Sequence, residues 1–468
     1  MHASQRVFEH LEAILNQSLN SSQRPLGAIV LGAGQGKRMR SNLPKVLHEI
    51  GRKPMINHVL DLVKSFNAEV ISVVVAPNHN SVTAAVHPIP TVIQQQALGT
   101  AHAVKAAADQ FSNFNGDIFI LFGDTPLIRH ETLQAMLDRR IAGDNPDIVV
   151  LGMRAKGENA YGRLILDKKG NLDRIVEFND ATEKEREHDL CNSGVMLIEG
   201  SKLFGLLERV ENQNSKGEYY LTDIIAILRA DGGLAAVVEG EESELQGVND
   251  RIELAAAEAI FQERARLAAM ANGVSMIAPE TVFFSHDVEV SQDVVIEPNV
   301  IFGPNTKVEA GATIRAFSHL EGAYITAGAI IGPFARLRPG SKIGAGARIG
   351  NFVEVKASVV ETEAKVNHLS YIGDARVGTK ANIGAGTITC NYDGFGKYST
   401  DIGDGAFIGS NSALVAPLKI GNGAMIGAGS TITKDVPDNA LGLERAPQST
   451  HPEWASGFRS RKKREKQK

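Results

Sequence analysis

The chain has 468 residues, of which 43% are hydrophobic and 22% charged, and its formal net charge is −5 at pH 7. This length favours two or three domains over a single core, and the composition is that of an ordinary globular protein. No apolar run is long enough to cross a bilayer and no secretory cleavage pattern opens the chain, so we expect a soluble, cytoplasmic protein with no membrane partner. The two cysteines, Cys191 and Cys390, lack metal-ligand spacing and are expected to be free thiols.

Residues 1–24 are predicted to form an extension before the first domain. Apolar side chains recur there at helical spacing, at Phe8, Leu11, Leu15 and Leu19, which predicts a weakly amphipathic helix. Serine and asparagine then dominate up to Pro25. We assign no function to this segment.

Residues 25–250 show short apolar runs that alternate with helical stretches. The predicted strands are Ala28–Leu31, Val70–Val75, Ile118–Phe122 and Ile148–Leu151, and one predicted helix is Ala97–Phe111. This alternation favours an α/β domain with a Rossmann-like, mixed or largely parallel sheet that is covered on both faces. Ligands of such folds bind beyond the carboxyl ends of the strands, where Gly32–Gly36 and Asp124 fall.

A glycine-rich turn follows the first predicted strand, in the sequence Leu31-Gly-Ala-Gly-Gln-Gly-Lys-Arg-Met39. Its glycines let backbone N–H groups point into one concavity, which suits phosphate groups. The dinucleotide fingerprint needs a glycine where Lys37 stands, and the Walker A loop needs Ser or Thr where Arg38 stands, so both motifs fail. A purely structural loop stays open as an alternative, although two cations beside the turn, Arg38 and Lys45, favour a ligand.

Further segments, in the same order, resemble the sugar-phosphate nucleotidyltransferases. The opening motif of that family is a glycine-rich turn with Arg-Met, followed by Pro-Lys, here Pro44 and Lys45. The other matching segments are Gln94 with Leu98-Gly-Thr100, Phe122-Gly-Asp-Thr-Pro-Leu127, Tyr161-Gly-Arg163, Glu177, Cys191-Asn-Ser-Gly194, Tyr220-Leu-Thr-Asp223 and Gly247-Val-Asn249. The resemblance covers residues 27–250 and implies transfer of a nucleotidyl group from a nucleoside triphosphate to a sugar 1-phosphate, with release of pyrophosphate.

The resemblance also implies a role for each residue. Arg38 would hold the leaving phosphates and Lys45 would neutralise the reacting phosphates, because catalysis of this kind is mostly positioning and charge neutralisation. Asp124 and Asn249 would hold Mg²⁺ through oxygen ligands. The implied nucleotide contacts are Leu31, Gly32, Ala33, Gly34, Lys45, Gln94, Gly99 and Thr100, and the implied sugar contacts are Gly162, Glu177 and Asn192, with Asn249 shared.

Other interpretations of these residues stay open. Asp124 follows a strand and also fits the cap of a following helix, and a surface glutamate such as Glu177 or a turn asparagine such as Asn192 is commonplace. Ala97 departs from the family pattern, which often has a polar residue there. Selectivity for uridine over thymidine rests on the resemblance alone.

A change of character begins at residue 251. Residues 251–270 are rich in Ala, Glu and Arg and lack Gly and Pro, which predicts a helix within a linker over 251–275. From about residue 276, aliphatic residues recur every six positions, which is typical of a parallel β-helix whose hexads form the faces of a triangular coil. The register is interrupted over 360–400, where Asn391–Gly394 is predicted to form a projecting loop. The periodic residues are Val290, Ile296, Phe302, Val308, Ile314, Leu320, Ile325, Ile331, Leu337, Ile343, Ile349, Val355, Ile402, Ile408, Leu414, Ile420, Ile426 and Ile432.

Residues outside the repeat suggest chemistry on the coil. Arg338 and Lys356 are 18 positions apart, one full coil, so their charges would stack and repel each other unless an anion lies between them. We therefore predict a phosphate-bearing substrate, with two solvated surface cations as the alternative. His368 is a candidate general base, or a structural histidine at a corner of the coil.

With the first half of the chain, these residues resemble the bacterial bifunctional N-acetylglucosamine-1-phosphate uridyltransferase/glucosamine-1-phosphate acetyltransferases. The matching segments are Ile331–Pro339, Gly350–Lys356, Asn367–Asp374 and Asn382–Gly394. The resemblance implies a left-handed parallel β-helix over 276–450 and a homotrimer with sites between neighbouring coils. It further implies acetyl transfer from acetyl-CoA to glucosamine-1-phosphate, followed by uridylyl transfer from UTP to N-acetylglucosamine-1-phosphate.

The same resemblance assigns residues on the coil. His368 would take the proton of the attacking amine, a task suited to an imidazole near neutral pH, and Glu354 would orient it. Cys390 is interpreted as a packing residue, because acetylation of an amine needs no acyl-enzyme. The implied sugar and phosphate contacts are Arg338, Lys356, Tyr371 and Asn382, and the implied acetyl-CoA contacts are Ala385, Asn391, Tyr392, Ser410, Ala428 and Arg445.

Residues 451–468 form a basic tail, in which the ten positions from Arg459 to Lys468 hold seven Lys or Arg and one Glu. We interpret it as a disordered, solubilising end and expect no nucleic-acid partner, because no interleaved aromatic residue or nucleic-acid motif accompanies the charges. Two rival functions stay open. In one, the coil is an inert regulatory cap on a nucleotidyltransferase, and in the other the whole chain is a catalytically inactive binding protein.

Overall fold

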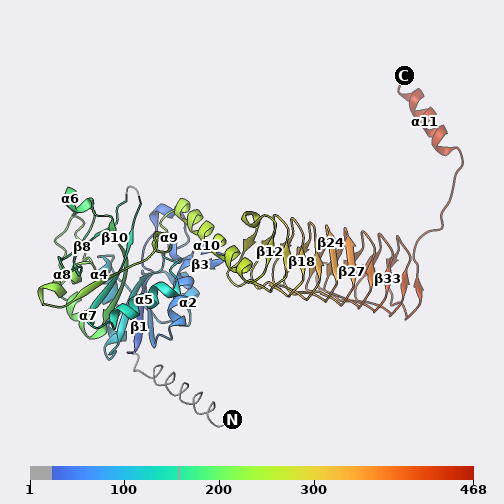
Figure 1. Cartoon of the computed structure of the whole chain (residues 1–468). Helices are drawn as coiled ribbons and strands as arrows, with labels where there is room; N and C mark the ends of the chain where they lie inside the picture. Colours follow the sequence, from blue (N-terminus) through green and yellow to red (C-terminus); the bar gives the residue numbers. More distant parts are fainter. Residues whose placement is uncertain (1–23, 157–158, 468) are drawn as a thin grey trace, which may run out of the picture. The chain divides into compact units, whose positions relative to one another are not determined.

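The computed structural model describes residues 24–156 and 159–467 (Figure 1). The chain divides into two compact units, residues 1–262 and 263–468, and the division falls within helix α10 (Arg251–Ala271). This helix confirms the one predicted over 251–270. The helix predicted within residues 1–24 lies outside the described residues, and the domain limits at 24, 250, 275 and 450 stay predictions.

The first unit is built on a mixed nine-stranded sheet whose main path has the order β11-β7-β10-β6-β1-β4-β5, with β8 and β9 off this path. Strand β10 runs antiparallel to both β6 and β7, whereas the other pairs on the path are parallel. All four predicted strands are confirmed. The strands are β1 (Leu26–Leu31), β4 (Val70–Val75), β5 (Thr91–Ile93), β6 (Asp117–Phe122), β7 (Ile148–Arg154), β8 (Arg163–Leu166), β9 (Leu172–Val176), β10 (Leu190–Glu199) and β11 (Ala235–Glu239), and a separate pair is β2 (Glu49–Ile50) with β3 (Lys53–Pro54).

Helices cover both faces of this sheet, as the sequence predicts. Side chains of a strand alternate between two cores, so that Ile29 packs on one side and its neighbours Ala28 and Val30 on the other. The first core includes residues of α4, α7 and α8, and the second includes residues of α2, α3 and α5. The helices are α2 (Met55–Ser65), α3 (Asn80–Val86), α4 (Thr100–Lys105), α5 (His130–Arg140), α6 (Glu183–Arg186), α7 (Gly200–Leu207), α8 (Asp223–Ala230) and α9 (Glu242–Leu245).

The helix predicted over Ala97–Phe111 is wrong at its start and in its continuity. Helix α4 begins only at Thr100, because Gly99 has a φ of +114°. The residue before it, Leu98, accepts a hydrogen bond from the N–H of Tyr219 at 2.8 Å instead of entering a helix. After Lys105 the chain continues to a separate 3₁₀ turn, Ala108–Phe111. A local tertiary contact therefore overrides the helical propensity of this segment.

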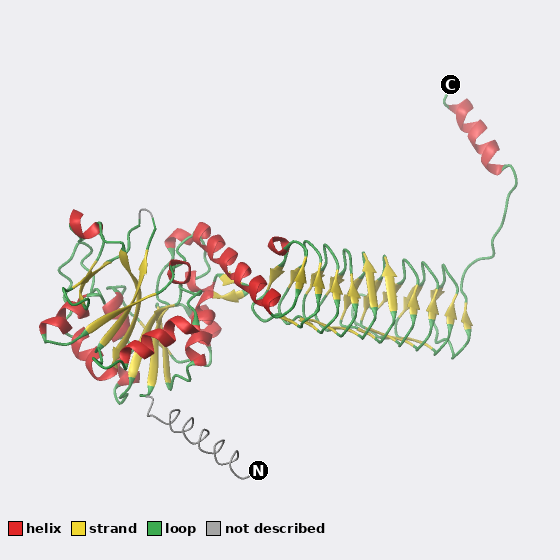
Figure 2. Cartoon of the chain, viewed as in Figure 1, coloured by secondary structure: helices red, strands yellow, loops and turns green. Residues whose placement is uncertain are grey.

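The second unit contains a parallel β-helix whose short strands stack into three ladders (Figure 2). The inward side chains lie directly above one another, as in the series Ile296, Ile314, Ile331 and Ile349. Every periodic residue of the sequence is buried except Val290, which is half-buried and packs against the core. The period of six is thus a burial pattern, as predicted.

The three ladders contain ten, nine and eight strands. The first comprises β12 (Ser275–Met276), β15 (Val295–Ile296), β18 (Thr313–Ile314), β21 (Ile330–Ile331), β24 (Arg348–Asn351), β27 (Lys365–His368), β30 (Asn382–Ile383), β33 (Phe407–Ile408), β36 (Met425–Ile426) and β38 (Leu441–Gly442). The second comprises β13 (Phe283–Phe284), β16 (Ile301–Phe302), β19 (His319–Leu320), β22 (Arg336–Leu337), β25 (Glu354–Lys356), β28 (Tyr371–Gly373), β31 (Ile388–Cys390), β34 (Ala413–Val415) and β37 (Thr431–Ile432). The third comprises β14 (Glu289–Val290), β17 (Lys307–Val308), β20 (Ala323–Ile325), β23 (Ser341–Ile343), β26 (Val359–Val360), β29 (Ala375–Val377), β32 (Thr400–Ile402) and β35 (Leu418–Ile420).

The interruption predicted over residues 360–400 is narrower in the structure. Strands β26 to β31 continue all three ladders, but with a coil one residue shorter, so that Val355 pairs with Ile372. The insertion proper is the loop between Cys390 and Thr400, whose exposed side chains include Tyr392 and Phe395. The projecting loop at Asn391–Gly394 is therefore confirmed, while the break in the coil around it is not.

The basic tail forms helix α11 (Trp454–Glu465), so the prediction that this end is disordered is wrong. Lysine, arginine and glutamate are good helix formers. Trp454 stacks on Phe458 one turn later with ring centroids 5.2 Å apart, and Lys462 pairs with Glu465 at 2.7 Å. Among residues 24–156 and 159–467, no helix is both long enough and apolar enough to cross a membrane.

The burial pattern of the coil predicts which valines hold it together. Val308 is fully buried, whereas Val295, at an outward position of the neighbouring ladder, is 38% exposed. Val308→Ala should lower the free energy of unfolding by about 2 kcal/mol, since it removes buried methyl groups and leaves a cavity. Val295→Ala should change it by less than about 0.5 kcal/mol. Urea unfolding followed by circular dichroism measures both, and equal effects would contradict the assigned register.

Candidate active sites

The glycine-rich turn leaves the sheet at Leu31, between strands β4 and β6. The N–H of Gly32 donates to the carbonyl oxygen of Val74 at 2.8 Å, which ties the start of the turn to the sheet. Gly36 has a φ of +58°, and a Cβ at this position would lie 2.6 Å from the Cβ of Lys45. Glycine is needed there because any side chain would displace Lys45.

A cavity of about 320 Å³ opens beyond the carboxyl ends of β1, β5 and β6, a size within the range of small-ligand sites. It unites most of the residues predicted for the nucleotide. Gly32 is buried beneath it, whereas Arg38 is exposed, does not line it, and forms no ion pair within the described residues. The lining residues are Leu31, Ala33, Gly34, Gln35, Lys45, Val46, Gln94, Ala97, Gly99, Thr100, Ala103, Phe122, Asp124 and Glu218.

Lys45 bridges the two predicted metal ligands. Its ammonium group contacts the carboxylate of Asp124 and donates to the amide oxygen of Asn249 at 3.1 Å. Asn249 is held in turn by Glu253, whose carboxylate accepts from the backbone N–H of Asn249 at 2.5 Å. Asp124 caps no helix, because α5 begins at His130 with Arg129 in the capping position. The interpretation of Asp124 as a helix cap is therefore excluded.

The side chains of Asp124 and Asn249 suit a small, hard cation. Their oxygens converge on one ammonium group, so a positive charge fits between them. One carboxylate and one amide oxygen, completed by substrate phosphates, form a donor set that Mg²⁺ accepts. In the described part of the chain, no group of three or more His, Cys, Asp or Glu side chains could hold a metal. The residues thus fit a cation that arrives with a phosphate substrate.

One polar edge of the cavity is formed by Gln94 and Gly99. The amide nitrogen of Gln94 donates to the carbonyl oxygen of Gly99 at 3.0 Å and lies 3.3 Å from Nδ1 of His102. A Cβ on Gly99 would come within 2.5 Å of the carbonyl oxygen of Tyr219. Glycine is therefore required at this position.

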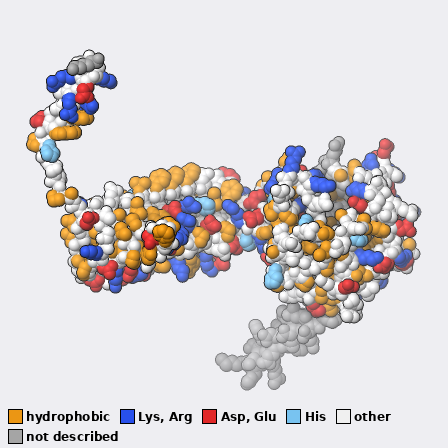
Figure 3. All heavy atoms as spheres, turned by 180° about the vertical axis from the view of Figure 1, so that it is seen from behind, with side chains coloured by type: hydrophobic (Ala, Val, Ile, Leu, Met, Phe, Trp, Pro, Cys, Tyr) orange, Lys and Arg blue, Asp and Glu red, His pale blue; other side chains and the backbone are white. Residues whose placement is uncertain are grey.

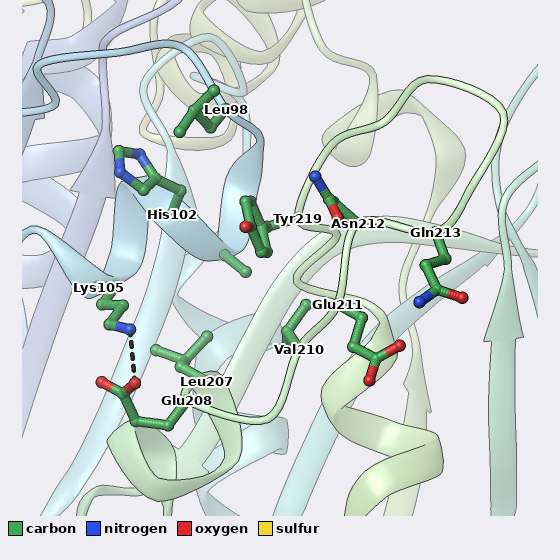
Figure 4. A pocket seen from close by; sticks show the side chains of 11 residues that line it. Leu98, His102, Lys105, Leu207, Glu208, Val210, Glu211, Asn212, Gln213 and Tyr219 are labelled. Atoms are coloured by element: carbon green, nitrogen blue, oxygen red, sulfur yellow. Dashed lines mark hydrogen bonds and ion pairs between the residues drawn. The ribbon is translucent and has the colours of Figure 1, made fainter.

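The other side of the same segment faces a second cavity, of about 440 Å³ (Figure 4). Leu98 and His102 line this cavity together with Tyr219, whereas Gly99 and Thr100 line the first. A surface ion pair between Lys105 and Glu208 closes one side, as the dashed line in Figure 4 shows. Residues 98–105 are therefore a common wall between two cavities.

Gly162, Glu177 and Asn192, the predicted sugar contacts, lie together. The N–H of Asn192 donates to the carbonyl oxygen of Gly162 at 2.8 Å, and a Cβ on Gly162 would lie 3.6 Å from Oε1 of Glu177. Thr222 donates its hydroxyl to Glu177 at 3.2 Å, and burial raises the pKa of Glu177. Asn192 is buried as well. Neither residue is the exposed, commonplace side chain of the alternative interpretation.

Asp223, which ends the matching segment Tyr220–Asp223 but was given no role of its own, belongs to the same cluster. It is the first residue of α8, next to Thr222. Burial raises the pKa of Asp223 to about 6, and repulsion from Glu177 and Asp180 adds to this. Carboxyl groups with raised pKa values are frequent at functional sites.

On the coil, His368 ends strand β27 and stands in register with Asn351 of β24. Its Nδ1 lies 2.8 Å from Oδ1 of Asn351. With the amide in this orientation its oxygen accepts from Nδ1, which leaves Nε2 as the ring nitrogen without a proton. Within one chain Glu354 does not contact His368, since it lies on another ladder and accepts from Arg338 at 2.9 Å, so its role in orienting His368 stays a prediction.

A cavity of about 170 Å³ contains His368. Its lining residues are Arg315, Ile330, Gly332, Pro333, Arg348, Ile349, Gly350, Asn351, Asn367 and His368. The predicted sugar and phosphate contacts Arg338, Lys356, Tyr371 and Asn382 are absent from this lining. Within one chain, the structure does not bring the candidate base and the candidate phosphate contacts into one cavity.

Arg338 and Lys356 stack in successive coils as predicted, because Leu337 and Val355 pair in register. The stacking itself does not require an external anion, which corrects the argument from the sequence. Each cation already faces a carboxylate, Arg338 that of Glu354 at 2.9 Å and Lys356 that of Asp374 at 3.9 Å. These carboxylates offset the repulsion between the cations.

A third cation, Lys397, nevertheless lies close to Lys356. Lys356 lowers the pKa of Lys397, through a hydrogen bond and through charge repulsion, and this outweighs the attraction of Asp374. Lys397 comes from the loop inserted after β31. The cluster therefore keeps a tendency to bind an anion that its own carboxylates do not remove.

Ala385, Ser410 and Ala428 form one column along the coil. Asn411 donates its N–H to the carbonyl oxygen of Ala385 at 2.7 Å. One coil further on, Gly429 donates its N–H to the carbonyl oxygen of Ser410 at 2.8 Å. The column ends where the guanidinium of Arg445 donates to the carbonyl oxygen of Ala428 at 2.8 Å. Four of the residues predicted for acetyl-CoA are thus contiguous.

The remaining predicted acetyl-CoA contacts lie in the inserted loop. Asn391 donates its amide to the carboxylate of Asp374, and the hydroxyl of Tyr392 donates to the carbonyl oxygen of Gly394. Burial raises the pKa of the neighbouring Cys390 thiol, which makes a reactive thiolate less accessible. This agrees with the interpretation of Cys390 as a packing residue.

Sequence reasoning missed three residues that contact the predicted ones: Asn351, Asp374 and His102. One of them carried a usable signal, because Asp374 follows Lys356 by the same 18 positions that separate Arg338 from Lys356. Asn351 precedes His368 by 17 positions, in a shorter coil, so the 18-residue spacing does not find it. No spacing rule connects His102 with Gln94, because their contact depends on the turn at Gly99.

The first unit is a nucleotidyltransferase-type α/β domain, and the second is a left-handed parallel β-helix of hexapeptide repeats. Residues 28–215 match the family model of the MobA-like NTP transferase domain. Residues 399–434 match the model of the bacterial transferase hexapeptide (six repeats). Both matches confirm the predicted fold class.

Curated relatives extend over almost the whole chain, and three of them are each called "Bifunctional protein GlmU". The relative from Paramagnetospirillum magneticum is 54% identical over 95% of this chain and 98% of its own length. Those from Rhodospirillum rubrum and Zymomonas mobilis are 56% and 48% identical, over 93% and 95% of this chain and 98% and 100% of their own lengths. The chain belongs to the family of GlmU bifunctional proteins, which confirms the resemblance predicted from its sequence.

The raised pKa of Asp223 predicts a pH-dependent gain in stability on substitution. Since its pKa of about 6 in the folded protein lies above the ordinary value, the stability this carboxyl contributes is present at low pH and is lost as the pH rises through about 6. Asp223→Asn should therefore raise the melting temperature more at pH 8 than at pH 4.5. Thermal unfolding at both pH values measures this.

Asp231 at the other end of α8 is the matched control, because Arg209 lowers its pKa. Asp231→Asn should lower the melting temperature slightly at pH 8. A gain for Asp223→Asn that is the same at pH 8 and pH 4.5 would contradict the raised pKa.

Proposed function

We propose that the chain makes UDP-N-acetylglucosamine in two steps, as a cytoplasmic enzyme. The β-helix transfers an acetyl group from acetyl-CoA to glucosamine-1-phosphate, and the first unit then transfers a uridylyl group from UTP to N-acetylglucosamine-1-phosphate. The observation that carries this proposal is that one chain of this family holds two separate reactive sets. These are Lys45 with Asp124 and Asn249 beside the glycine-rich turn, and His368 with Asn351 on the coil.

In the uridylyl step, an oxygen of the sugar phosphate attacks the α-phosphorus of UTP, and pyrophosphate leaves. Lys45 would neutralise both phosphates, exchanging its contacts with Asp124 and Asn249 for contacts with phosphate oxygens. The two freed side chains would hold Mg²⁺, which supplies charge neutralisation to the phosphates when it is bound. Arg38, which is exposed on the turn, would reach over the cavity to the leaving phosphates.

The remaining contacts of this step follow from the cavity. The turn at Gly32, Ala33 and Gly34 would offer backbone N–H groups to the phosphates. Gln94, Gly99 and Thr100 would border the base. Gly162, Glu177 and Asn192 lie together and would bind the sugar with its N-acetyl group.

In the acetyl step, the amine of glucosamine-1-phosphate attacks the carbonyl carbon of the thioester. The carbon–nitrogen bond forms, the carbon–sulfur bond breaks, and coenzyme A leaves as the thiol after taking up a proton. Nε2 of His368 would accept the proton of the amine, while Asn351 keeps the other proton on Nδ1. Arg338 and Lys356 would bind the sugar phosphate, Tyr371 and Asn382 the sugar, and the column ending at Arg445 acetyl-CoA.

We propose that the chain acts as a homotrimer, because a single chain leaves the cavity of His368 without the predicted phosphate contacts Arg338 and Lys356. Exposed hydrophobic side chains gather along the β-helix (Figure 3). Among them, the half-exposed rings of Phe317, Phe334 and Phe352 stack with centroids 4.9 and 5.2 Å apart. An exposed apolar ladder of this kind is typical of a protein–protein contact. A second copy seated on it would supply the missing groups.

The order of the two steps is tested with UTP, Mg²⁺ and glucosamine-1-phosphate, by following pyrophosphate with and without acetyl-CoA. We expect release only with acetyl-CoA, since the first unit should require the N-acetyl group. Release without acetyl-CoA would contradict this order. If neither mixture releases pyrophosphate, N-acetylglucosamine-1-phosphate is supplied directly. Release would then show that the coil is inactive, and no release would show that the first unit is inactive.

Two variants separate the proposal from its rivals. His368→Ala should lower acetyl transfer by about 10²–10⁴-fold and leave uridylyl transfer from N-acetylglucosamine-1-phosphate unchanged. Asp124→Ala should do the reverse. Unaltered acetyl transfer in His368→Ala would favour the coil as an inert cap, and unaltered pyrophosphate release in Asp124→Ala would contradict the role of the first site.

A further inference from the structure

The amide group of Gln94 has only one way to face the cavity. Its nitrogen lies 3.0 Å from the carbonyl oxygen of Gly99, and a carbonyl oxygen can only accept a hydrogen bond. The nitrogen of the amide must therefore point to Gly99. The second hydrogen of the same nitrogen is directed at Nδ1 of His102, 3.3 Å away. Both donors of Gln94 are used inside the protein, and its Oε1 remains as a pure acceptor.

The partners that hold Gln94 are themselves fixed. Tyr219 donates its N–H to the carbonyl oxygen of Leu98 at 2.8 Å and accepts from the N–H of Ala101 at 3.0 Å. This clamp sets the direction of the Gly99 carbonyl, and the absence of a Cβ at Gly99 allows the close approach. His102 lies on α4 within the wall, and with Leu98 it lines the second cavity (Figure 4).

Gln94 is also buried, with 7% of its surface exposed. A buried amide that loses one of its internal partners is left with an unsatisfied donor, which is costly. Rotating the amide by half a turn would face its oxygen toward the Gly99 oxygen and would leave both acceptors unpaired. The orientation of Gln94 is therefore enforced by two contacts, one from Gly99 and one from His102.

A pure acceptor at this edge distinguishes pyrimidine bases. Uracil and thymine carry a hydrogen on N3 and can donate it to Oε1, whereas N3 of cytosine is an acceptor and would face a second acceptor. Sites built around a hydrogen bond of fixed direction reject ligands that leave it unpaired. The same edge cannot separate uracil from thymine, because both have the N3 hydrogen.

We propose that His102 is a positioning residue for base selection, which locks Gln94 as an acceptor and so makes the first unit prefer UTP over CTP. The inference rests on the proposed uridylyl transfer for its substrate, and it adds a residue that does not itself touch the base. His102 acts through Gln94 from the far side of the wall.

The test measures dissociation constants of UTP, dTTP and CTP for the full-length protein, with Mg²⁺ present. His102→Leu removes the acceptor, and His102→Asn restores one, since Oδ1 of asparagine takes a place close to that of Nδ1. We expect His102→Leu to lower the preference for UTP over CTP by about five- to tenfold. The ratio of UTP to dTTP should stay unchanged, and His102→Asn should recover most of the preference. Gln94→Leu should abolish the preference for UTP over CTP.

Steady-state kinetics with N-acetylglucosamine-1-phosphate add a second readout. His102→Leu should raise the KM for UTP and leave kcat within about twofold, because the residue affects binding of the base and not the reacting phosphates. An unchanged ratio of UTP to CTP in His102→Leu or in Gln94→Leu would overturn the proposal. So would an equal loss of affinity for all three nucleotides, which would make His102 a support of the fold only. Wild-type protein that binds UTP but releases no pyrophosphate would contradict the proposed function instead, and the affinity ratios would still decide the role of His102.

Discussion

The parallel register of the buried aliphatic side chains positions the functional groups that lie on the strands of the β-helix. Because inward residues such as Ile331 and Ile349 pair directly between coils, the outward residues beside them stack in columns. Asn351 thereby meets His368, and Arg338 lies above Lys356. A shift of one residue would turn the aliphatic side chains outward and the polar ones inward, so the core that stabilises the coil also sets the geometry of its chemistry.

The first unit positions its functional groups through the ends of its parallel strands and through one anchored loop. Its parallel strands end at one edge of the sheet, where Leu31 and Asp124 meet although they are far apart in sequence. Asn249 arrives from the segment before α10 and is fixed by Glu253 in the first turn of that helix. The start of α10 therefore completes the cluster around Lys45. A stable edge of the sheet and one anchored loop suffice to assemble a site from three distant segments.

The sequence predicts those features that follow from a repeating burial pattern or from a motif of fixed spacing. The strands of the sheet, the hexad core and the cavity with Lys45 and Asp124 belong to this class. Side-chain partners across the chain do not, because their choice depends on which carboxylate or amide the fold brings nearest. Glu354 was therefore assigned to His368, whereas within one chain it binds Arg338. The predicted start of α4 is wrong for a related reason. A contact with Tyr219 decides where the helix begins, and no local sequence pattern indicates that contact.

Both candidate sites hold their cations against carboxylates of the same chain. Lys45 contacts Asp124 in the first unit, and Arg338 pairs with Glu354 on the coil. Such pairs keep long side chains extended and aimed at the site, which lowers the entropy lost when a phosphate binds. They also mean that an incoming phosphate competes with a carboxylate that is already in place, and the competition is weaker for exposed pairs.

One cation on the coil, Lys397, remains repelled by a neighbouring cation. Repulsion from Lys356 lowers the pKa of Lys397 despite the nearby Asp374. A phosphate group placed between Lys356 and Lys397 would relieve that repulsion and would share Lys356 with the carboxylate of Asp374, 3.9 Å away. The inserted loop that carries Lys397 thus adds a positive charge beside the pairs of Arg338 with Glu354 and of Lys356 with Asp374, so this face attracts an anion more strongly than the regular coil residues alone would.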